Sequence, residues 1–498
     1  MAAYEIVIRN GNVIDGTGAM AFTADIGIDG GRIACVGSIS QSGNTEIDAE
    51  GMTVSPGFID VHTHDDFAAL LYPDMNFKLL GGVTTCVVGN CGMGAAPFPQ
   101  AAVLARAFHP NKELPDWDGY GGYLSHIDNH PTSINIAALA GHGTIRMAVM
   151  GRDNREPDDK EMAKMKSLLQ EGLDAGVVGL STGLIYDPGR FATTEEIIEL
   201  ASIMQETGGL YATHMRNEGS GLLGSIEESL RIGREAKVPV QISHHKASGR
   251  DNWGLVRESL RKIELAQAQG LDVHADQYPY TAGSTVLSAT MDEGALDDYP
   301  GGGLGRLPPE NIVIASTQGH QEWEGKSIKD LAAEFGQSPR ATAEKILELK
   351  PGVTVILHTM SEDDVRMVMQ HKSTMIGSDG IPTLDGKPHP RLYNTFARVL
   401  GHYARELKLF PLEEAVHKMT GFSARKFGLI DRGEIREGAF ADIVAFDADL
   451  VIDRGTFSEP NQYPAGIRHV WVNGQHVVVD GRATGRRPGK ALRRASAD

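Results

Sequence analysis

From about residue 56 to residue 425, short apolar runs alternate with amphipathic helices, and this repeat restricts the possible folds more than any other feature. One helix keeps apolar residues at helical spacing from Met162 to Leu173 and ends at Gly176, before the apolar run VVGLS. Two more helices precede LYATH and VPVQISHH in the same way. Strands that alternate with helices usually pair in parallel, so the sequence predicts an α/β fold, most simply a (β/α)8 TIM-like barrel.

Nine apolar runs compete for the eight strand positions of such a barrel. They lie near residues 58–62, 84–89, 134–139, 177–180, 210–214, 239–244, 271–275, 353–358 and 374–378. The segment from about 281 to 346, rich in Gly and Pro at 300–309, fits neither a strand nor a long helix. We interpret it as an insertion after a barrel strand, which could serve as a lid over a site.

The two ends of the chain have a different pattern of short alternating strands. Asn-Gly and Asp-Gly pairs separate these strands in residues 4–54. The same pattern of short strands and turn residues occurs in GAFADIVAFDADLVID and IRHVWVNGQHVVVDGRAT. We therefore expect a small β-sandwich built from both termini, with residues 1–55 and 426–498 as its two parts. The metal-dependent barrel, residues 56–425, would be inserted between them.

Composition excludes several classes of function. The formal net charge is -18, and no basic block precedes Arg486 to Arg494, which disfavours nucleic-acid binding. Only three cysteines occur, Cys35, Cys86 and Cys91, as expected for a reducing cytoplasm. The sequence shows no signal peptide and no apolar run long enough for a membrane span. We expect a cytoplasmic protein without a membrane or nucleic-acid partner.

A metal site is predicted where the apolar run GFIDV ends in His62 and His64, followed by Asp65 and Asp66. Residues i and i+2 of a strand point to the same face, so both imidazoles can reach one point beyond the strand end. Two surface histidines would give the same pattern. The Pro-Gly entry and the continuous apolar run favour a buried parallel strand that opens into a functional loop.

Other polar residues close the remaining predicted strands, where a barrel enzyme has its active site. They are Cys91, His142, His214, His244, His245, Tyr278, Tyr280 and Asp379. Thiolate, imidazole and carboxylate groups together form a ligand set that zinc favours. Asp379, after the last strand, is a natural general base, although it could instead cap the next helix.

Some of these residues have equally plausible structural roles. Cys86 lies inside a strand and is expected to be a buried apolar residue. His142 and His274 remain open between a structural role and the site. Strand alternation allows only one of His244 and His245 to face inward, and we favour His244.

The chain resembles the D-aminoacylases, or N-acyl-D-amino-acid deacylases, of the amidohydrolase superfamily. The resemblance runs along nearly the whole chain and is carried by GFIDVHTHDD, GVTTCVVGNCG, STGLIYDPG, YATHMRNE, QISHHK, YPYTAGST, GSDG, HPRLYNTFARVLGHY and GAFADIVAFD. It implies a zinc hydrolase in which a cysteine replaces the bridging carbamylated lysine of many amidohydrolases.

The resemblance also implies roles for individual residues. Cys91, His214 and His244 would hold a tightly bound Zn2+. His62, His64 and Asp379 would form a weaker second position, with Asp379 also the catalytic base. Lys246, Tyr278, Ser284 and Arg391 would lie near the substrate, and Arg391 would pair with its α-carboxylate.

The expected reaction is hydrolysis of the amide of a small N-acyl-D-amino acid to a carboxylate and a free D-amino acid. Tyr186, Leu357 and Met360 could line an apolar pocket for the side chain of this substrate, whereas Lys246 or Arg306 could accept an acidic one, as in N-acyl-D-Asp or N-acyl-D-Glu. The sequence slightly favours a hydrophobic or broad preference. The alternatives are a cyclic amidase of the dihydroorotase or hydantoinase kind and a non-catalytic barrel scaffold without a metal.

Overall fold

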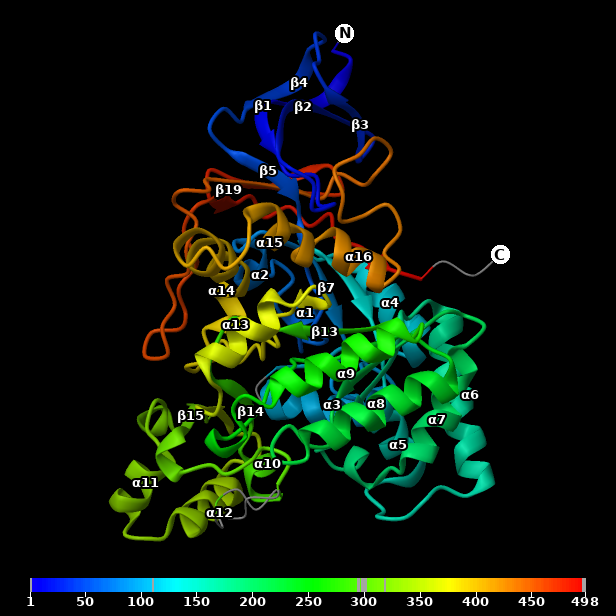
Figure 1. Ribbon diagram of the computed structural model, residues 1–498, viewed down its shortest axis with the longest axis vertical. Helices are drawn as coiled ribbons and strands as arrows, with labels where there is room; N and C mark the ends of the chain where they lie inside the picture. The colour runs from blue at the N-terminus through cyan, green and yellow to red at the C-terminus, as the bar shows by residue number, and fades with distance from the viewer. Residues whose placement is uncertain (1, 110–111, 293–295, 297–301, 318, 495–498) are drawn as a thin grey trace.

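The two ends of the chain meet in one nine-stranded sheet, at the top of Figure 1. The computed structural model describes residues 2–109, 112–292, 296, 302–317 and 319–494. The sheet contains β1 (Tyr4–Val13), β2 (Phe22–Asp29), β3 (Arg32–Gly37), β4 (Gly43–Asp48), β5 (Thr53–Pro56), β18 (Ile443–Phe446), β19 (Ile467–Val472), β20 (Gln475–Val479) and β21 (Arg482–Ala483). Antiparallel pairing of β5 with β18 joins the two parts.

The Asn-Gly and Asp-Gly pairs have two different roles in this sheet. Asn473-Gly474 and Asp480-Gly481 form turns between neighbouring strands, with φ angles between 47° and 77°. Asn10 also has a positive φ, 57°, but it lies inside β1, where the register shifts between Ile8 and Gly11. The expected turn at Asn10 is therefore wrong, because the pair forms a bulge within one long strand.

Strands of the central segment, together with β22 near the C-terminus, form two parallel sheets. The first has the order β22-β8-β7-β6, and the second has the order β17-β13-β12-β11-β10-β9. Their strands are β6 (Phe58–Asp60), β7 (Val83–Val88), β8 (Asn135–Ala138), β9 (Ala140–Gly141), β10 (Gly179–Gly183), β11 (Leu210–His214), β12 (Val240–Ile242), β13 (Val273–Gln277), β17 (Thr374–Ile376) and β22 (Ala491–Leu492).

Backbone pairing does not close these sheets into one continuous ladder among the described residues. β8 and β9 follow each other directly in the chain but belong to different sheets. At the other edges, β6 and β17 approach through an isolated parallel bridge between Thr63 and Gly380. The α/β fold with parallel strands is as predicted.

Helices follow most of the strands, as the sequence pattern indicates. They are α1 (Ala68–Leu71), α2 (Asn76–Leu79), α3 (Phe98–Phe108), α4 (Gly119–Asn129), α5 (His142–Met150), α6 (Asp159–Ala175), α7 (Thr194–Ala201), α8 (Leu222–Ala236), α9 (Val256–Ala268), α13 (Glu362–Gln370), α14 (Arg391–Arg398), α15 (Leu412–Met419) and α16 (Gly421–Lys426). A π-helix, Val399–Glu406, continues α14. Within the described ranges, no helix has the length and apolar character needed to cross a membrane.

The predicted insertion has secondary structure of its own and projects at the lower left of Figure 1. It has an antiparallel sheet of β14 (Gly283–Val286), β16 (Thr354–Leu357) and β15 (Ile312–Ser316), with helices α10 (Leu287–Asp292), α11 (Ile328–Phe335) and α12 (Pro339–Leu349). The run at 353–358 is thus not a barrel strand, and the insertion extends beyond residue 346. Parts of the suggested lid, 293–295, 297–301 and 318, lie outside the described residues.

Candidate metal centre and substrate cavity

The predicted metal-site residues lie together at the carboxyl ends of the parallel strands. His214 is the last residue of β11, and the others lie in the short segments that follow β6, β7, β12 and β17. Three of them have left-handed backbones, with φ angles of 54° at Cys91, 36° at His244 and 50° at Asp379. A non-glycine residue is rarely held in this region unless the surrounding structure requires it, and such residues cluster at functional sites.

Cys91 is the centre of the first group. Its Sγ lies 3.4 Å from His62 Nε2, 3.6 Å from His214 Nδ1 and 3.7 Å from His244 Nε2. The facing nitrogens of His214 and His244 are only 2.8 Å apart. All four side chains are buried, so their donor atoms converge on one point that excludes bulk water.

Asp379 is the centre of the second group. Its Oδ1 lies 3.2 Å from His64 Nε2 and 3.5 Å from His62 Nε2. One donor atom from each of these three residues lies within 4.8 Å of the other two. Asp379 does not cap a helix, because the next one begins at Arg391. His62 belongs to both groups and joins them.

Two buried carboxylates orient the histidines, and sequence reasoning missed both. His62 Nδ1 lies 3.2 Å from Asp276 Oδ1, and the His244 backbone N–H donates to the same oxygen at 2.9 Å. His244 Nδ1 lies 2.9 Å from Glu218 Oε1. Carboxylates behind ligating histidines fix ring orientation and tautomer. Two features of the sequence could have identified them. Glu218 lies four positions after His214, and Asp276 is an acidic residue inside an apolar strand.

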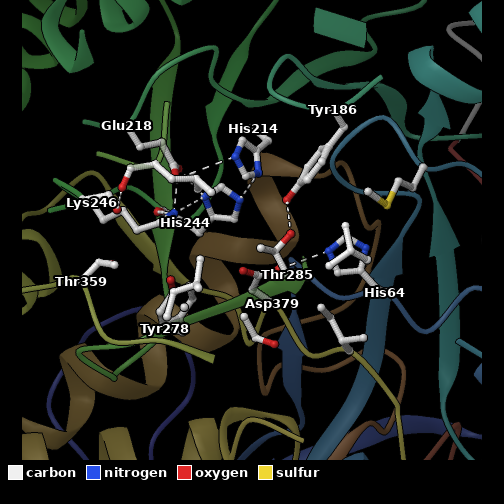
Figure 2. A pocket seen from close by; sticks show the side chains of 18 of the residues that line it. His64, Tyr186, His214, Glu218, His244, Lys246, Tyr278, Thr285, Thr359 and Asp379 are labelled. Carbon is white, nitrogen blue, oxygen red and sulfur yellow. Dashed lines mark hydrogen bonds and ion pairs between the residues drawn. The ribbon is translucent and has the colours of Figure 1, made fainter. Parts of the chain in front are cut away.

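The metal-site groups border a cavity of about 600 Å³, a volume that includes space open to solvent. Figure 2 shows His64, His214, His244 and Asp379 around it, with Tyr186 on the opposite wall from Tyr278 and Lys246. Apolar side chains complete the lining: Met93, Phe108, Val286, Leu304, Leu357 and Ile381. A mostly apolar wall with a few polar groups at one end is typical of a small-molecule site.

The four residues predicted near the substrate occupy different positions. Lys246, Tyr278 and Ser284 line the cavity. Arg391 is buried behind them, with Nη2 2.9 Å from Asp379 Oδ2 and its guanidinium carbon 4.4 Å from the centre of the Tyr278 ring. Its Nε and Nη1 have no hydrogen-bond partner among the described residues. Two donors of a buried cation are therefore available next to the cavity.

Three other histidines lie outside the cluster. His142 is buried against Glu196, with Nε2 2.9 Å from a carboxylate oxygen. His245 points to Ser259, its Nε2 2.8 Å from the hydroxyl, which leaves His244 as the member of the pair that faces the cavity. His274 lies near the opposite end of β13, 3.0 Å from Asp272.

Other candidates also lie apart from the cavity. Cys86 is buried, as expected, and its thiol is 3.6 Å from Asp65 Oδ2. Met360 accepts a hydrogen bond from the Tyr278 hydroxyl at 3.5 Å, and Arg306 is exposed. Neither Met360 nor Arg306 lines the cavity.

Electrostatics keep the two acidic groups at the centre, Cys91 and Asp379, in the anionic forms that bind cations. Burial by itself would raise the pKa of the Cys91 thiol, but the His62, His214 and His244 imidazoles hold this pKa well below its usual value. Burial would also raise the pKa of Asp379, but Arg391 and the neighbouring histidines hold it well below the ordinary range. Thiolate, carboxylate and paired imidazole nitrogens facing one point form a donor set that fits a transition-metal ion.

The family model for the amidohydrolase family matches residues 45–293 and 260–478. The chain belongs to this family. D-aminoacylase of Alcaligenes xylosoxydans xylosoxydans is 43% identical over 99% of this chain and 98% of its own length. N-acyl-D-glutamate deacylase of the same organism is 40% identical over 98% and 96% of the two chains. The predicted resemblance is confirmed.

A solved structure of a related deacylase has a similar fold. A crystal structure of N-acyl-D-glutamate deacylase from Bordetella bronchiseptica, complexed with zinc and a phosphonate inhibitor, superposes with a TM-score of 0.88. The two chains are 39% identical, with 98% of this chain and 99% of that chain covered. The amidohydrolase has the α/β fold of these deacylases, and its donor set agrees with the binding of a metal.

Proposed function

We propose that this amidohydrolase hydrolyses N-acyl-D-amino acids to a carboxylate and a free D-amino acid. The observation that carries the proposal is the convergence of Cys91 with three imidazoles, beside Asp379 and Arg391, at the border of an apolar cavity. Three relatives, 39 to 43% identical over nearly the whole chain, are named as deacylases of D-amino acid derivatives. The cluster supplies groups for amide cleavage, and Arg391 supplies a group for an anionic substrate.

The two parallel sheets, in this proposal, form one eight-position barrel in which β8 and β9 share a position. Support comes from their adjacency in the chain and from the bridge between Thr63 and Gly380. Residues 1–55 and 426–498 would form the small β domain, apart from β22, which pairs with β8, and residues 56–425 would form the barrel and its insertion. A barrel brings all the strand ends around one mouth, as the clustered site residues require.

Zinc is the proposed metal. Cys91, His214 and His244 would hold one ion, and His62, His64 and Asp379 would hold a second, weaker one. Bound zinc polarises an amide carbonyl and lowers the pKa of water. Asp276 and Glu218 keep the rings of His62 and His244 in position for this binding.

Asp379 is the proposed proton carrier. Its carboxylate stays ionised and would accept a proton from the attacking water, then deliver it to the leaving nitrogen. Arg391 would bind the α-carboxylate of the substrate through its two donors without a partner among the described residues. If the α-carboxylate and the amide carbonyl are both held in place, only one enantiomer of the substrate can direct its side chain into the cavity.

We further propose a neutral, mainly apolar substrate side chain. Lys246 lines the cavity, but its Nζ is 2.7 Å from Glu218 Oε1 and is thus already paired. Burial would lower the pKa of Lys246, but Glu218 raises it, so the pair stays ionic. Leu304, Leu357 and Tyr186 offer apolar surface instead. Preference for N-acetyl-D-Asp or N-acetyl-D-Glu would contradict this part of the proposal.

The decisive experiment is a chiral amine-release assay on N-acetyl-D- and N-acetyl-L-amino acids, with the zinc content of the same sample determined. We expect release from D forms only, fastest with leucine and methionine. Asp379→Asn should lower kcat at least 100-fold, because loss of general-base catalysis typically costs two to four orders of magnitude. Hydrolysis of hydantoins or dihydropyrimidines with no release from linear amides would instead favour the cyclic amidase, in which a carbamylated lysine is expected in place of Cys91.

A further inference from the structure

A second cavity, of about 1110 Å³ including space open to solvent, adjoins the one described above. Met93, Phe108, Tyr186 and Val286 line both cavities, so the two cavities share a wall. Residues of α3, α5 and α10 form much of the remaining lining. None of the roles assigned so far uses this second space.

The position of the reacting amide decides which part of a substrate would face the second cavity. Asp379 and Ser284 line the first cavity, and Arg391 contacts both of them, so the α-carboxylate would lie on that side. Cys91, by contrast, lines the second cavity. A substrate whose carbonyl lies at the Cys91 cluster therefore directs its acyl chain away from Arg391, into the second cavity.

The lining of the second cavity suits a hydrocarbon chain. Its apolar side chains include Met93, Val103, Phe108, Met147, Val286 and Ala289. Methionine adapts to irregular apolar ligands because its side chain is unbranched and flexible. Among the described residues of the lining, the one carboxylate, Asp187, is paired with the side chain of Arg190. Val103 is 47% exposed, so the cavity opens to solvent on the α3 side.

We propose that this second cavity binds the acyl group, and that the preferred substrates carry medium-length alkyl chains rather than acetyl. The inference rests on the proposed deacylase function and adds the class of acyl group. Burial of one methylene increases binding roughly fourfold, so several additional methylenes have a large effect until the chain reaches solvent.

The first test is a series of N-acyl-D-leucines with acetyl, butanoyl, hexanoyl, octanoyl and decanoyl groups, together with N-succinyl-D-leucine. We expect kcat/KM to rise at least tenfold from acetyl to hexanoyl and then to level off. A flat or falling series, with acetyl hydrolysed, overturns the acyl-site proposal and leaves the deacylase function intact. Succinyl faster than hexanoyl also overturns it, because the exposed Arg152 in the lining would then select an anionic chain. Release from no acyl group overturns both proposals.

Two substitutions that fill the second cavity test whether it causes the dependence of kcat/KM on acyl-chain length. Met147→Trp, in α5, and Val103→Trp, at the exposed rim, should each lower the octanoyl-to-acetyl ratio of kcat/KM at least tenfold. Met20→Trp is the matched control, because Met20 is 85% exposed and does not line either cavity. Val103→Trp keeps the test valid if Met147→Trp fails to fold. An unchanged ratio in folded Val103→Trp overturns the assignment.

Binding of the carboxylate product gives a readout independent of turnover. Calorimetric titration of the zinc-loaded protein should show octanoate binding at least tenfold more tightly than butanoate, with the difference reduced in Val103→Trp. Equal affinities for the two carboxylates would overturn the proposal.

Discussion

At the residue scale, the arrangement of Arg391 distinguishes this site most clearly from a simple metal cluster. Arg391 lies beneath the Tyr278 ring and contacts Asp379 and the Ser284 carbonyl through one nitrogen. Its motif, HPR, identified it in the sequence. The sequence could not predict that the Arg391 guanidinium also pairs with Asp379, the proposed base. This contact depends on the path of the loop after β17, which brings the two residues together.

Arg391→Lys should lower kcat/KM for N-acyl-D-amino acids by roughly 10- to 150-fold, because hydrogen bonds to charged groups contribute about 1.5–3 kcal/mol. Lysine keeps the charge but lacks the planar fork that binds a carboxylate at two points. The measurement is steady-state kinetics on N-acetyl-D-leucine. Arg398→Lys is the control, since Arg398 lies on the same helix but pairs with Asp453 at 2.7 Å. Equal losses in both variants would indicate a general effect on α14 instead.

At the element scale, the helices follow local sequence signals closely. α6 begins at a capping box, in which the Asp158 side chain accepts from the Lys160 and Glu161 backbones. It ends at Gly176, whose φ of 103° is the left-handed conformation that glycine adopts readily. Such an element is predictable because its limits depend on neighbouring residues. The sequence predicts a barrel strand where β16 lies, because a buried apolar run has the same appearance in a parallel and in an antiparallel sheet.

Asp158→Ala should destabilise the first turn of α6 by about 1 kcal/mol, since the cap and its reciprocal bond from the Asp158 N–H to Glu161 are both weakened. Hydrogen exchange of the amides at the start of α6 should become roughly fivefold faster, from the same free-energy change. Asp159→Ala, one residue later and without a capping bond, is the matched control. Equal exchange rates in the two variants would contradict the role of the cap.

At the scale of the whole molecule, the C-terminal segment connects the terminal sheet to the parallel strands. β22 pairs with β8, and Ile136 donates its N–H to the Lys490 carbonyl. Asn135 accepts from the Lys490 N–H and donates to Asp442. In sequence, this segment is only a short basic tail. Its role depends on contacts between residues more than 300 positions apart, which no local pattern records.

Truncation after Gly485 should lower Tm by several degrees and increase hydrogen exchange in β8. It removes the β22 pairing, the Arg493 ion pair with Asp128 and the Arg494 bond to the Thr207 carbonyl. Each lost hydrogen bond contributes about 1 kcal/mol. Truncation after Arg494 keeps all of these contacts and is the control. Unchanged Tm after the longer deletion would show that β8 is stable without the tail.

The sequence by itself determined the alternation of strands and helices, the β character of both ends and most of the cluster at the strand ends. These features depend on local periodicity and on the rule that the carboxyl ends of parallel strands share one edge. His62, His64, Cys91, His214, His244 and Asp379 could therefore be listed as candidates one strand at a time, together with His142 and His245, and the resemblance to the deacylases singled out the six.

The tertiary structure alone decided which groups surround that cluster. Glu218 and Asp276 orient the histidines, Glu218 also pairs with Lys246, and His142 lies against Glu196 instead of at the site. Each of these contacts joins side chains from different strands or loops, and burial makes their charges depend on the partner that packing supplies. Packing between distant segments also encloses the second cavity beside Cys91. The local sequence pattern identifies the candidate site residues, and three-dimensional packing determines which groups and cavities surround them.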